Sequence, residues 1–198
     1  MSALLQAGDG NTEISPEEMI QLILPLSTRA ELNQAERVNI NSARVWAMKA
    51  GNLKRTDLLT DAFSRELHRR MFNGVWRWAG HFRTTEKNIG WETHRLLEGV
   101  RVAFDDAQYW LSNATYPETE IVVRLHHRLV RVHPWPNGNG RHARLMADVI
   151  LVSRGHEALN WGSRLDLTAR GEARIRYLEA IRAADQLDYA PLLAFAVS

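Results

Sequence analysis

Residues 133–144 begin with a histidine and include two glycines and two arginines, in an order suited to chemistry on a phosphate. The segment reads HPWPNGNGRHAR. Gly138 and Gly140 open backbone conformations that other residues avoid, so successive N–H groups can turn inward as an anion-binding nest. The helix expected to follow begins with amides that lack intrahelical partners and attract anions. The loop therefore predicts a phosphate-binding site.

Arg141 and Arg144 lie three residues apart in the first turn of that helix, on one face. Cations at a helix N-terminus oppose the macrodipole, by about 0.3–1 kcal/mol each in exposed settings. Their presence is explained if an anion lies between the helix and the guanidinium groups, which bind phosphate oxygens in bidentate fashion. A nucleoside triphosphate offers several such anions.

His133 immediately precedes the loop, at the end of the helix before it. A neutral imidazole can accept the proton of an incoming hydroxyl, and the ordinary histidine pKa of about 6.5 suits that role. The alternative is a histidine that only stabilises a helix C-terminus as His⁺. Its position beside the phosphate site favours the catalytic interpretation.

Two other motifs in this region predict different functions. Gly138, Gly140 and Ala143 loosely match a dinucleotide fingerprint, but that fold needs a preceding strand, and the pattern here is helical. Four histidines could suggest a metal, yet three-histidine zinc sites usually come with tighter spacing or a nearby acid. We interpret His126 and His127 as structural or surface residues.

Composition is typical of one soluble domain of 198 residues, with 45% hydrophobic and 24% charged residues. There is no cysteine, which excludes disulfide scaffolds, Cys-ligated zinc and thiol catalysis. No apolar run approaches the roughly 20 residues that span a bilayer, and residues 1–12 lack the pattern of a secretory signal. We therefore expect a cytoplasmic protein without membrane contact.

Charge is concentrated rather than spread. The net charge is only +2, but residues 121–147 hold five arginines and four histidines without an acid. This favours an anionic ligand at one site over a nucleic-acid surface, so no direct nucleic-acid partner is expected.

The hydrophobic periodicity predicts an all-α fold in a single domain. Ser15 and Glu18 have capping-box spacing before a helix expected to end near Leu24. The stretch 76–91 breaks the helical rhythm and predicts an irregular loop or small hairpin, whose Trp residues belong to the core or to an interface. The other helices are expected at about 29–50, after Thr56, and at 95–112, 118–132, 141–153, 168–184 and 189–197.

The segment 133–144 resembles the signature of the Fic (Fic/Doc) proteins, His-x-Phe-x-Asp/Glu-Gly-Asn-Gly-Arg-x-x-Arg. It matches position for position, except that Trp135 stands for the phenylalanine and Asn137 for the acid. Residues 78–85 look like the start of the Fic flap, and residues 177–195 look like the family's C-terminal helices. The whole chain is most similar to the branch called mobile mystery protein B, named for its occurrence on mobile elements beside a helix-turn-helix partner.

The resemblance implies a protein adenylyltransferase that transfers AMP from ATP to a Ser, Thr or Tyr hydroxyl of a target protein, with Mg²⁺ as cofactor. His133 would be the general base, Arg141 would bind the β-phosphate and Arg144 the γ-phosphate. The flap edge would align the target segment by strand pairing. The nucleotide-binding residues implied are Asn137, Gly138, Asn139, Gly140, Arg141, Arg144, Lys87, Asn88, Ile89, Gly90, Tyr177 and Asp185. Tyr177 and Asp185 match positions that border the base and ribose, the alternative being a core tyrosine and a solvated aspartate.

Asn137 is the departure from the family pattern that bears most on activity. The family's acid binds the metal, and an asparagine carbonyl is a weaker, neutral ligand for a hard cation. We therefore expect weaker metal binding at Asn137. The Doc branch, which phosphorylates, carries lysine where this chain has Gly140. Adenylylation is therefore the expected reaction.

Many Fic proteins carry an inhibitory helix with the pattern Ser/Thr-x-x-x-Glu-Gly/Asn, whose glutamate pairs with the motif's second arginine. Ser27 and Glu31 resemble this pattern, with Leu32 inserted before the small polar residue Asn33. The resemblance implies that Glu31 pairs with Arg144 and inhibits the enzyme. The alternative is that Glu31 only completes a capping box for its own helix.

The resemblance divides the chain into an N-terminal extension with a short helix, residues 1–26, and a Fic domain with a small flap hairpin, residues 27–198. The inhibitory helix would occupy residues 27–50. Other functions stay open, namely another nucleotidyl or phosphoryl transfer, a catalytically weak nucleotide-binding regulatory module, or a partner-binding component of a two-protein mobile cassette. In such a cassette the partner would be the helix-turn-helix protein.

Overall fold

The computed structural model describes residues 14–162 and 171–198, and within these ranges it is built from helices and loops. Each long helix follows from an apolar stripe at helical spacing that must find a partner. Their bounds are α1 Pro16–Met19, α2 Arg29–Ala47, α3 Ala50–Leu53, α4 Asp61–Phe72, the 3₁₀ turn η2 Thr93–Arg95, α5 Leu96–Ser112, α6 Glu118–Val132, α7 Asn139–Ser153, α8 Glu172–Asp185 and α9 Ala190–Val197.

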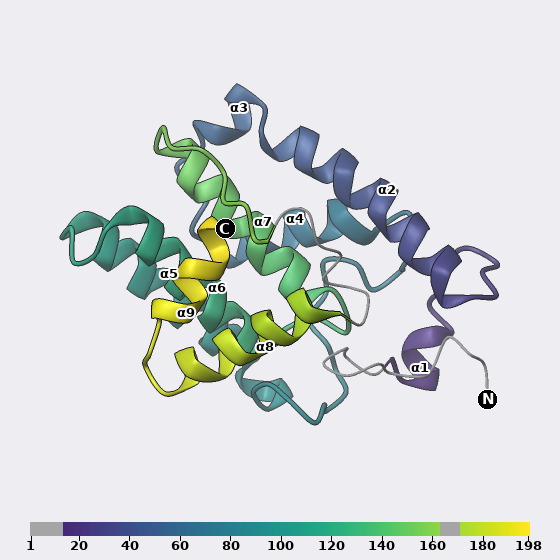
Figure 1. The fold of residues 1–198 in the computed structure, drawn as a ribbon. Helices are drawn as coiled ribbons and strands as arrows, with labels where there is room; N and C mark the ends of the chain where they lie inside the picture. The colour runs from purple at the N-terminus through teal and green to yellow at the C-terminus, as the bar shows by residue number, and fades with distance from the viewer. Residues whose placement is uncertain (1–13, 163–170) are drawn as a thin grey trace.

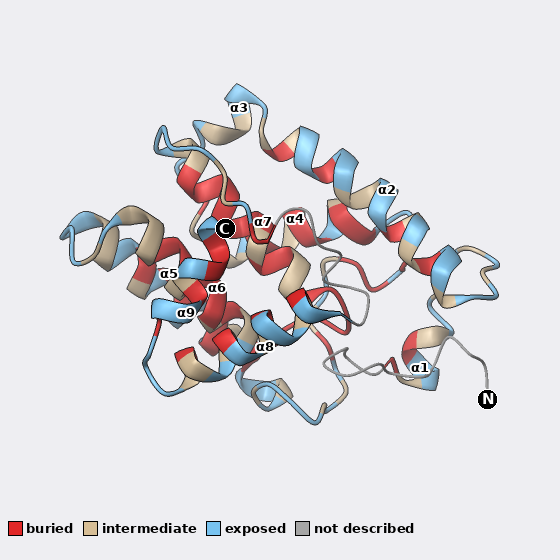
Figure 2. Ribbon diagram, in the orientation of Figure 1, coloured by how far each residue is buried: buried red, intermediate tan, exposed pale blue. Residues whose placement is uncertain are grey.

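Helices α6 and α7 pack against each other at the centre of the molecule (Figure 1). Helix α4 packs on α2 and α7, α5 packs on α6, and the pair α8–α9 lies beside α6. Figure 2 shows buried residues concentrated on α6 and α7, whereas much of α2 is exposed along its outer side. The described residues form helices and loops, which confirms the predicted all-α class.

Two predicted helices are shorter than expected. Helix α1 begins with the predicted Ser15–Glu18 capping box, but it ends at Met19 rather than near Leu24. The residues that follow pair with a distant segment instead, because the Ile23 amide donates to the Val75 carbonyl at 2.8 Å. Helix α2 ends at Ala47 rather than near residue 50, and the short α3 begins at Ala50. The predicted helix near 168–184 starts in 168–170, which lies outside the described residues; α8 begins at Glu172.

Residues 83–91 form an irregular loop, and no strand is assigned in the part of the chain that the structure describes. The small flap hairpin is therefore not observed, and the irregular-loop alternative holds. Trp76 and Trp78 nearby are 1% and 5% exposed, so both belong to the core rather than to an exposed interface. Within residues 14–162 and 171–198, no helix has the length and apolar character required to cross a membrane.

Candidate functional site

The predicted phosphate loop lies at the centre of the fold, where it connects the end of α6 to the start of α7. His133 caps α6 in the left-handed conformation, with φ 54° and ψ 56°. Gly138 caps the start of α7 with φ 82°, and a Cβ there would lie 2.3 Å from the Phe72 ring. Only glycine satisfies both the positive φ and this close approach. The two caps turn the chain sharply between the two central helices.

Internal hydrogen bonds and ring stacking hold the loop in shape. The Asn139 side chain accepts from the Trp135 amide at 2.9 Å and donates to the Trp135 carbonyl at 2.8 Å. The Trp135 indole is fully buried and stacks on the His68 ring with centroids 4.0 Å apart. The Gly80 amide donates to His68 Nδ1, so His68 Nε2 carries the proton and donates to the Asn137 carbonyl at 3.2 Å. The Asn139 side chain therefore contributes to the site by holding the loop in this conformation.

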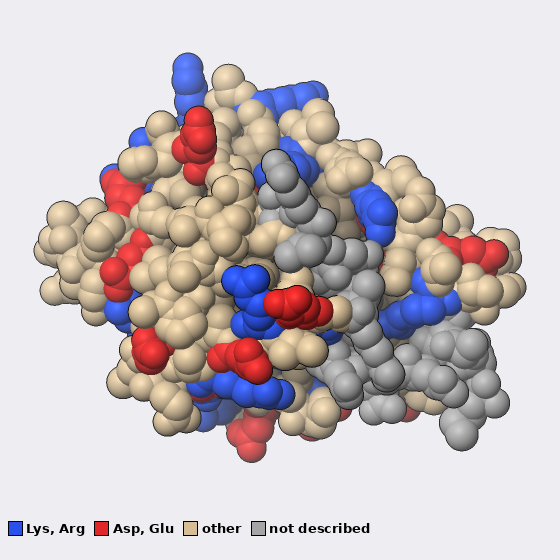
Figure 3. Space-filling view, viewed as in Figure 1, with Lys and Arg blue, Asp and Glu red and all other residues tan. Residues whose placement is uncertain are grey.

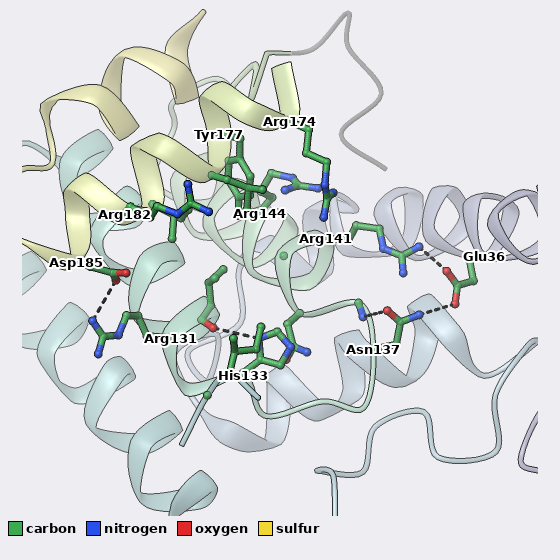
Figure 4. A pocket seen from close by; sticks show the side chains of 18 of the residues that line it. Glu36, Arg131, His133, Asn137, Arg141, Arg144, Arg174, Tyr177, Arg182 and Asp185 are labelled. Atoms are coloured by element: carbon green, nitrogen blue, oxygen red, sulfur yellow. Dashed lines mark hydrogen bonds and ion pairs between the residues drawn. The ribbon is translucent and has the colours of Figure 1, made fainter. Parts of the chain in front are cut away.

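The loop opens onto a pocket of about 700 Å³ (Figure 4). Cationic side chains from α2, α6, α7 and α8 line it, namely Arg29, Arg131, Arg141, Arg144, Arg174 and Arg182. The acids among its described lining are Glu36 and Asp185. Burial lowers the pKa of Arg144, and the neighbouring charge of Arg141 acts in the same direction. The site therefore favours an anion that would relieve the crowding of positive charge.

These cations are gathered at the pocket, whereas the rest of the visible surface carries mixed charge. On the face shown in Figure 3, Lys and Arg side chains are interspersed with Asp and Glu among uncharged residues. The described surface in that view does not present the continuous basic stripe that binding to a nucleic-acid backbone needs.

His133 lies at the edge of the pocket and is 5% exposed. Its Nδ1 is 3.3 Å from the Val130 carbonyl oxygen, which places the proton on Nδ1 and leaves Nε2 as the basic nitrogen. Burial lowers the pKa of His133 to about 4, and the charges of Arg83 and Lys87 contribute in the same direction. The imidazole is therefore neutral near pH 7, as a general base must be.

A buried arginine joins the flap, which is the irregular loop of residues 83–91, to this histidine. The Arg83 guanidinium donates to the His133 carbonyl at 2.8 Å, to the Thr85 carbonyl at 2.9 Å and to the Trp91 carbonyl. A Cβ at Gly90 would lie 2.6 Å from the His133 Cβ, so the flap passes directly over the histidine. Arg83 thus fixes both ends of the flap relative to His133.

Glu36, which sequence analysis did not single out, is the acid that enters the phosphate end of the pocket. Its carboxylate is 1% exposed and accepts from Arg141 at 2.6 Å, from Asn137 Nδ2 at 3.1 Å and from Trp76 Nε1 at 2.7 Å. Figure 4 shows this carboxylate between Arg141 and Asn137. A detectable signal existed, because Glu36 is four residues after Leu32 and so shares the buried stripe of its helix.

The predicted contact between Glu31 and Arg144 is absent from the described structure. The Glu31 carboxylate accepts from the Ser27 and Thr28 amides at 2.8 and 2.9 Å, and Thr28 completes the capping box. These backbone hydrogen bonds lower the pKa of Glu31, and the residue does not line the pocket. The capping alternative therefore describes Glu31, and Ser27 serves the same cap.

The flap residues are divided between the pocket and its outer side. Ile89 and Gly90 line the pocket as expected, but Lys87 and Asn88 are not among its lining. The Lys87 ammonium instead donates to the Glu18 carboxylate at 2.6 Å. The prediction that Lys87 contacts the nucleotide is not supported by this arrangement.

Tyr177 and Asp185, which the resemblance places beside the base and ribose, both line the pocket from α8. The Tyr177 hydroxyl is 3.0 Å from His126 Nε2, and Asp185 Oδ1 is 2.8 Å from His127 Nε2. Asp185 also accepts from Arg131 at 3.1 Å. His126 and His127 are thus buried structural residues that orient the two side chains at the far end of the pocket.

Comparison with known proteins finds a family match that includes this loop. Residues 58–151 match the Fic/DOC family. Protein adenylyltransferase fic-1 of Caenorhabditis elegans is 37% identical over 94 residues, which are 46% of this chain and 18% of that protein. Protein adenylyltransferase Fic of Drosophila grimshawi is 26% identical over 135 residues, which are 66% of this chain and 26% of that protein. The chain thus spans about a fifth to a quarter of these relatives.

Solved structures share the fold at lower identity. The N-terminal Fic domain of a putative cell filamentation protein from Bartonella quintana superposes with a TM-score of 0.67 at 13% identity, covering 98% of this chain and 90% of that one. A fragment of Fic-1 from C. elegans gives a TM-score of 0.64 at 24% identity, covering 88% of this chain and 50% of that one.

Proposed function

We propose that this chain, whose residues 58–151 match the Fic/DOC family, is a protein adenylyltransferase that transfers AMP from ATP to a hydroxyl side chain of a target protein. The observation that carries the proposal is a neutral, buried His133 at the edge of an arginine-lined pocket. A binding module has no need of a base at that point. The absence of cysteine and the use of ATP both favour the cytoplasm as the compartment.

The proposed reaction uses this chain's own residues at each step. Nε2 of His133 takes the proton of the target hydroxyl, whose oxygen attacks the α-phosphorus of ATP. The bond between the α-phosphorus and the bridging oxygen breaks, and pyrophosphate leaves with the bonding electrons. The first amides of α7 and the guanidinium groups of Arg141 and Arg144 neutralise the phosphate charge. Tyr177 and Asp185 border the far end, where the nucleoside lies.

The test uses each of the four nucleoside triphosphates, labelled on the α- or the γ-phosphate. Wild type and His133→Ala are incubated with each donor, and intact-mass analysis reads self-modification. We expect a nucleoside monophosphate adduct from ATP in the wild type only. A phosphate adduct from the γ-label would establish phosphoryl transfer, the alternative that Asn137 permits. Tight ATP binding without an adduct on this chain or on proteins of a cell extract would favour the regulatory module.

Mg²⁺, expected from the family pattern, meets a poor set of donors in this pocket. Asn137 Oδ1 already accepts from the Gly138 amide at 2.8 Å, and the Glu36 carboxylate serves three donors. Among the described residues, no group of three or more His, Asp or Glu is arranged to hold a metal ion. A hard cation prefers free carboxylate oxygens. In this pocket Asn137 offers the ion only a neutral carbonyl oxygen, so we assign the proposed step to the arginines and amides.

Asn137→Asp should therefore make nucleotide binding depend on Mg²⁺. We expect the wild-type dissociation constant for a non-hydrolysable ATP analogue to change by less than about threefold between EDTA and Mg²⁺, against at least about tenfold in the variant, because a carboxylate adds a charged hard ligand. Titration calorimetry measures both. Equal Mg²⁺ dependence in the two proteins would contradict the expectation.

Glu36, rather than Glu31, is the acid that we propose restrains the site. Arg141 cannot give its full charge to a phosphate while Glu36 holds it, and hydrogen bonds to charged groups contribute about 1.5–3 kcal/mol. Glu36→Gln should therefore bind the ATP analogue about 10–100 times more tightly than wild type. Calorimetry in EDTA measures this effect without a metal contribution.

Glu31→Gln is the matched control for that prediction. It removes a carboxylate from the same helix but keeps a side-chain oxygen that can complete the capping box, so the protein should stay folded with little change in ATP affinity. Tighter binding in Glu31→Gln with unchanged binding in Glu36→Gln would return the inhibitory role to Glu31.

A further inference from the structure

One carboxylate connects the N-terminal segment, residues 14–24, to the flap. Glu18 lies in α1 and is 5% exposed. Its Oε2 accepts from Lys87 Nζ at 2.6 Å, and its Oε1 accepts from the Thr85 hydroxyl at 2.7 Å. The Lys87 and Glu18 side chains are only 6% and 7% exposed, so this ion pair is shielded from water. Removal of either partner would leave a buried charge without its counter-ion.

The same segment is attached to the core independently of the flap. Ile14 is 2% exposed, the Ile23 amide donates to the Val75 carbonyl at 2.8 Å, and the Arg77 amide donates to the Gln21 carbonyl at 3.0 Å. A helix of four residues such as α1 is not stable alone. The core contacts therefore hold α1 in place, and α1 in turn presents Glu18 to the flap.

Glu18 contacts residues that come just before the part of the flap that faces the pocket. Thr85 and Lys87 contact Glu18, whereas Ile89 and Gly90 line the pocket beside His133. Arg83 holds the two ends of the flap at the Thr85 and Trp91 carbonyls, and Glu18 holds its outer side between them. The position of the pocket rim thus depends on an anchor from each side.

We propose that Glu18 is a positioning residue for the transfer reaction, which makes the N-terminal segment 14–24 part of the site. By holding Thr85 and Lys87, it fixes residues 88–90 as the edge on which a target segment lies against His133. The inference rests on the proposed function in taking this edge as the target-binding one. It assigns to Glu18 a larger effect on the protein acceptor than on the nucleotide, which Ile89 and Gly90 contact only at the pocket rim.

Four variants test the inference, namely Glu18→Gln, Lys87→Met, the double variant, and Glu17→Gln as an exposed neighbour on the same helix. Hydrogen exchange measures the order of the flap. We expect exchange of amides 84–91 to speed up by about tenfold in both single variants, with no further increase in the double variant, because the two residues act through one contact. Glu17→Gln should leave exchange unchanged.

Transfer and nucleotide binding supply the second readout. With a His133→Ala copy of this chain as the protein acceptor, Glu18→Gln should lower AMP transfer about tenfold. Binding of the ATP analogue should change much less, by about twofold, since Ile89 and Gly90 form only the rim of the pocket while the arginines that hold the phosphates lie on other elements. Equal losses in binding and transfer would overturn the inference, because they would show general damage to the fold.

The two readouts separate this inference from the function on which it rests. If wild type transfers nothing, the proposed function fails, and hydrogen exchange still decides whether Glu18 orders the flap. Unchanged exchange of amides 84–91 in Glu18→Gln overturns the inference whatever the activity. Should that variant fail to fold, Thr85→Val and Lys87→Met remove the same two contacts from the flap side, and the same criteria apply.

Discussion

Replacement of His133 by alanine is expected to lower AMP transfer by about 10²–10⁴-fold, the usual contribution of a positioned general base. ATP binding should stay within about twofold, because the amides and arginines that hold the phosphates come from α7 and not from this side chain. Transfer is followed as α-label incorporated per enzyme, and binding by calorimetry. His94→Ala is the matched control, since that histidine is 74% exposed and lies outside the pocket.

The protonation of His133 as a function of pH tests the same residue independently. Burial lowers the pKa of His133 to about 4, so the base stays neutral as pH falls from 7 to 5.5. With the ordinary pKa of about 6.5, only about a tenth of it would be neutral at pH 5.5. NMR titration of the His133 ring in the free protein measures this directly. A midpoint near 6.5 would contradict the lowered pKa of His133, and full transfer by His133→Ala would remove His133 from the proposed role.

Much of the fold follows from local patterns in the sequence. Helix α6 occupies Glu118–Val132, the range that its apolar periodicity predicts, and α5 begins one residue later than expected, at Leu96. The capping boxes at Ser15 and Thr28 both form, because each needs only residues within one turn. Pattern fails at helix ends such as Met19, where the next residues gain backbone hydrogen bonds to residues 75–77.

The site was predictable where one segment supplies it and not where distant segments meet. His133, Gly138 and Arg144 all line the pocket, since they lie within one short segment of the chain, residues 133–144. Glu31 was expected to pair with Arg144, but it satisfies a local cap. The acid that enters the pocket is Glu36, which is more than 100 residues from Arg141 and reaches it through the fold.

Lys87 illustrates the same limit on the opposite side of the pocket. Its place beside Ile89 and Gly90 in the flap suggested nucleotide contact, but its ammonium is held by Glu18, which is 69 residues away in the sequence. A local motif predicts which residue types are available. Only tertiary packing determines which charges meet and are thereby removed from the pocket.

The buried histidines should make the protein strongly sensitive to acid. Burial lowers the pKa of His133 and of His142 to about 4, and it lowers the pKa of His68 and His126 well below the ordinary value. Between pH 6.5 and 4 the unfolded chain therefore binds protons that the folded chain does not. Stability is fully present above about pH 6.5 and is lost as pH falls. His133 and His142 should each lower the free energy of unfolding by about 2 kcal/mol between pH 7 and pH 5.

Urea unfolding at pH 7, 6 and 5 measures this loss, which should total at least about 4 kcal/mol because His68 and His126 add to it in the same direction. Asp148 opposes it in part, since burial raises the pKa of that carboxyl. The matched variant is His142→Gln, whose amide can still donate to the Ser64 carbonyl that His142 Nε2 contacts at 3.0 Å. Its stability should fall by about 2 kcal/mol less than that of wild type over the same range. An unfolding free energy that is constant from pH 7 to pH 5 in wild type would contradict the burial of neutral imidazoles, and with it the basis for a neutral His133 at the pocket.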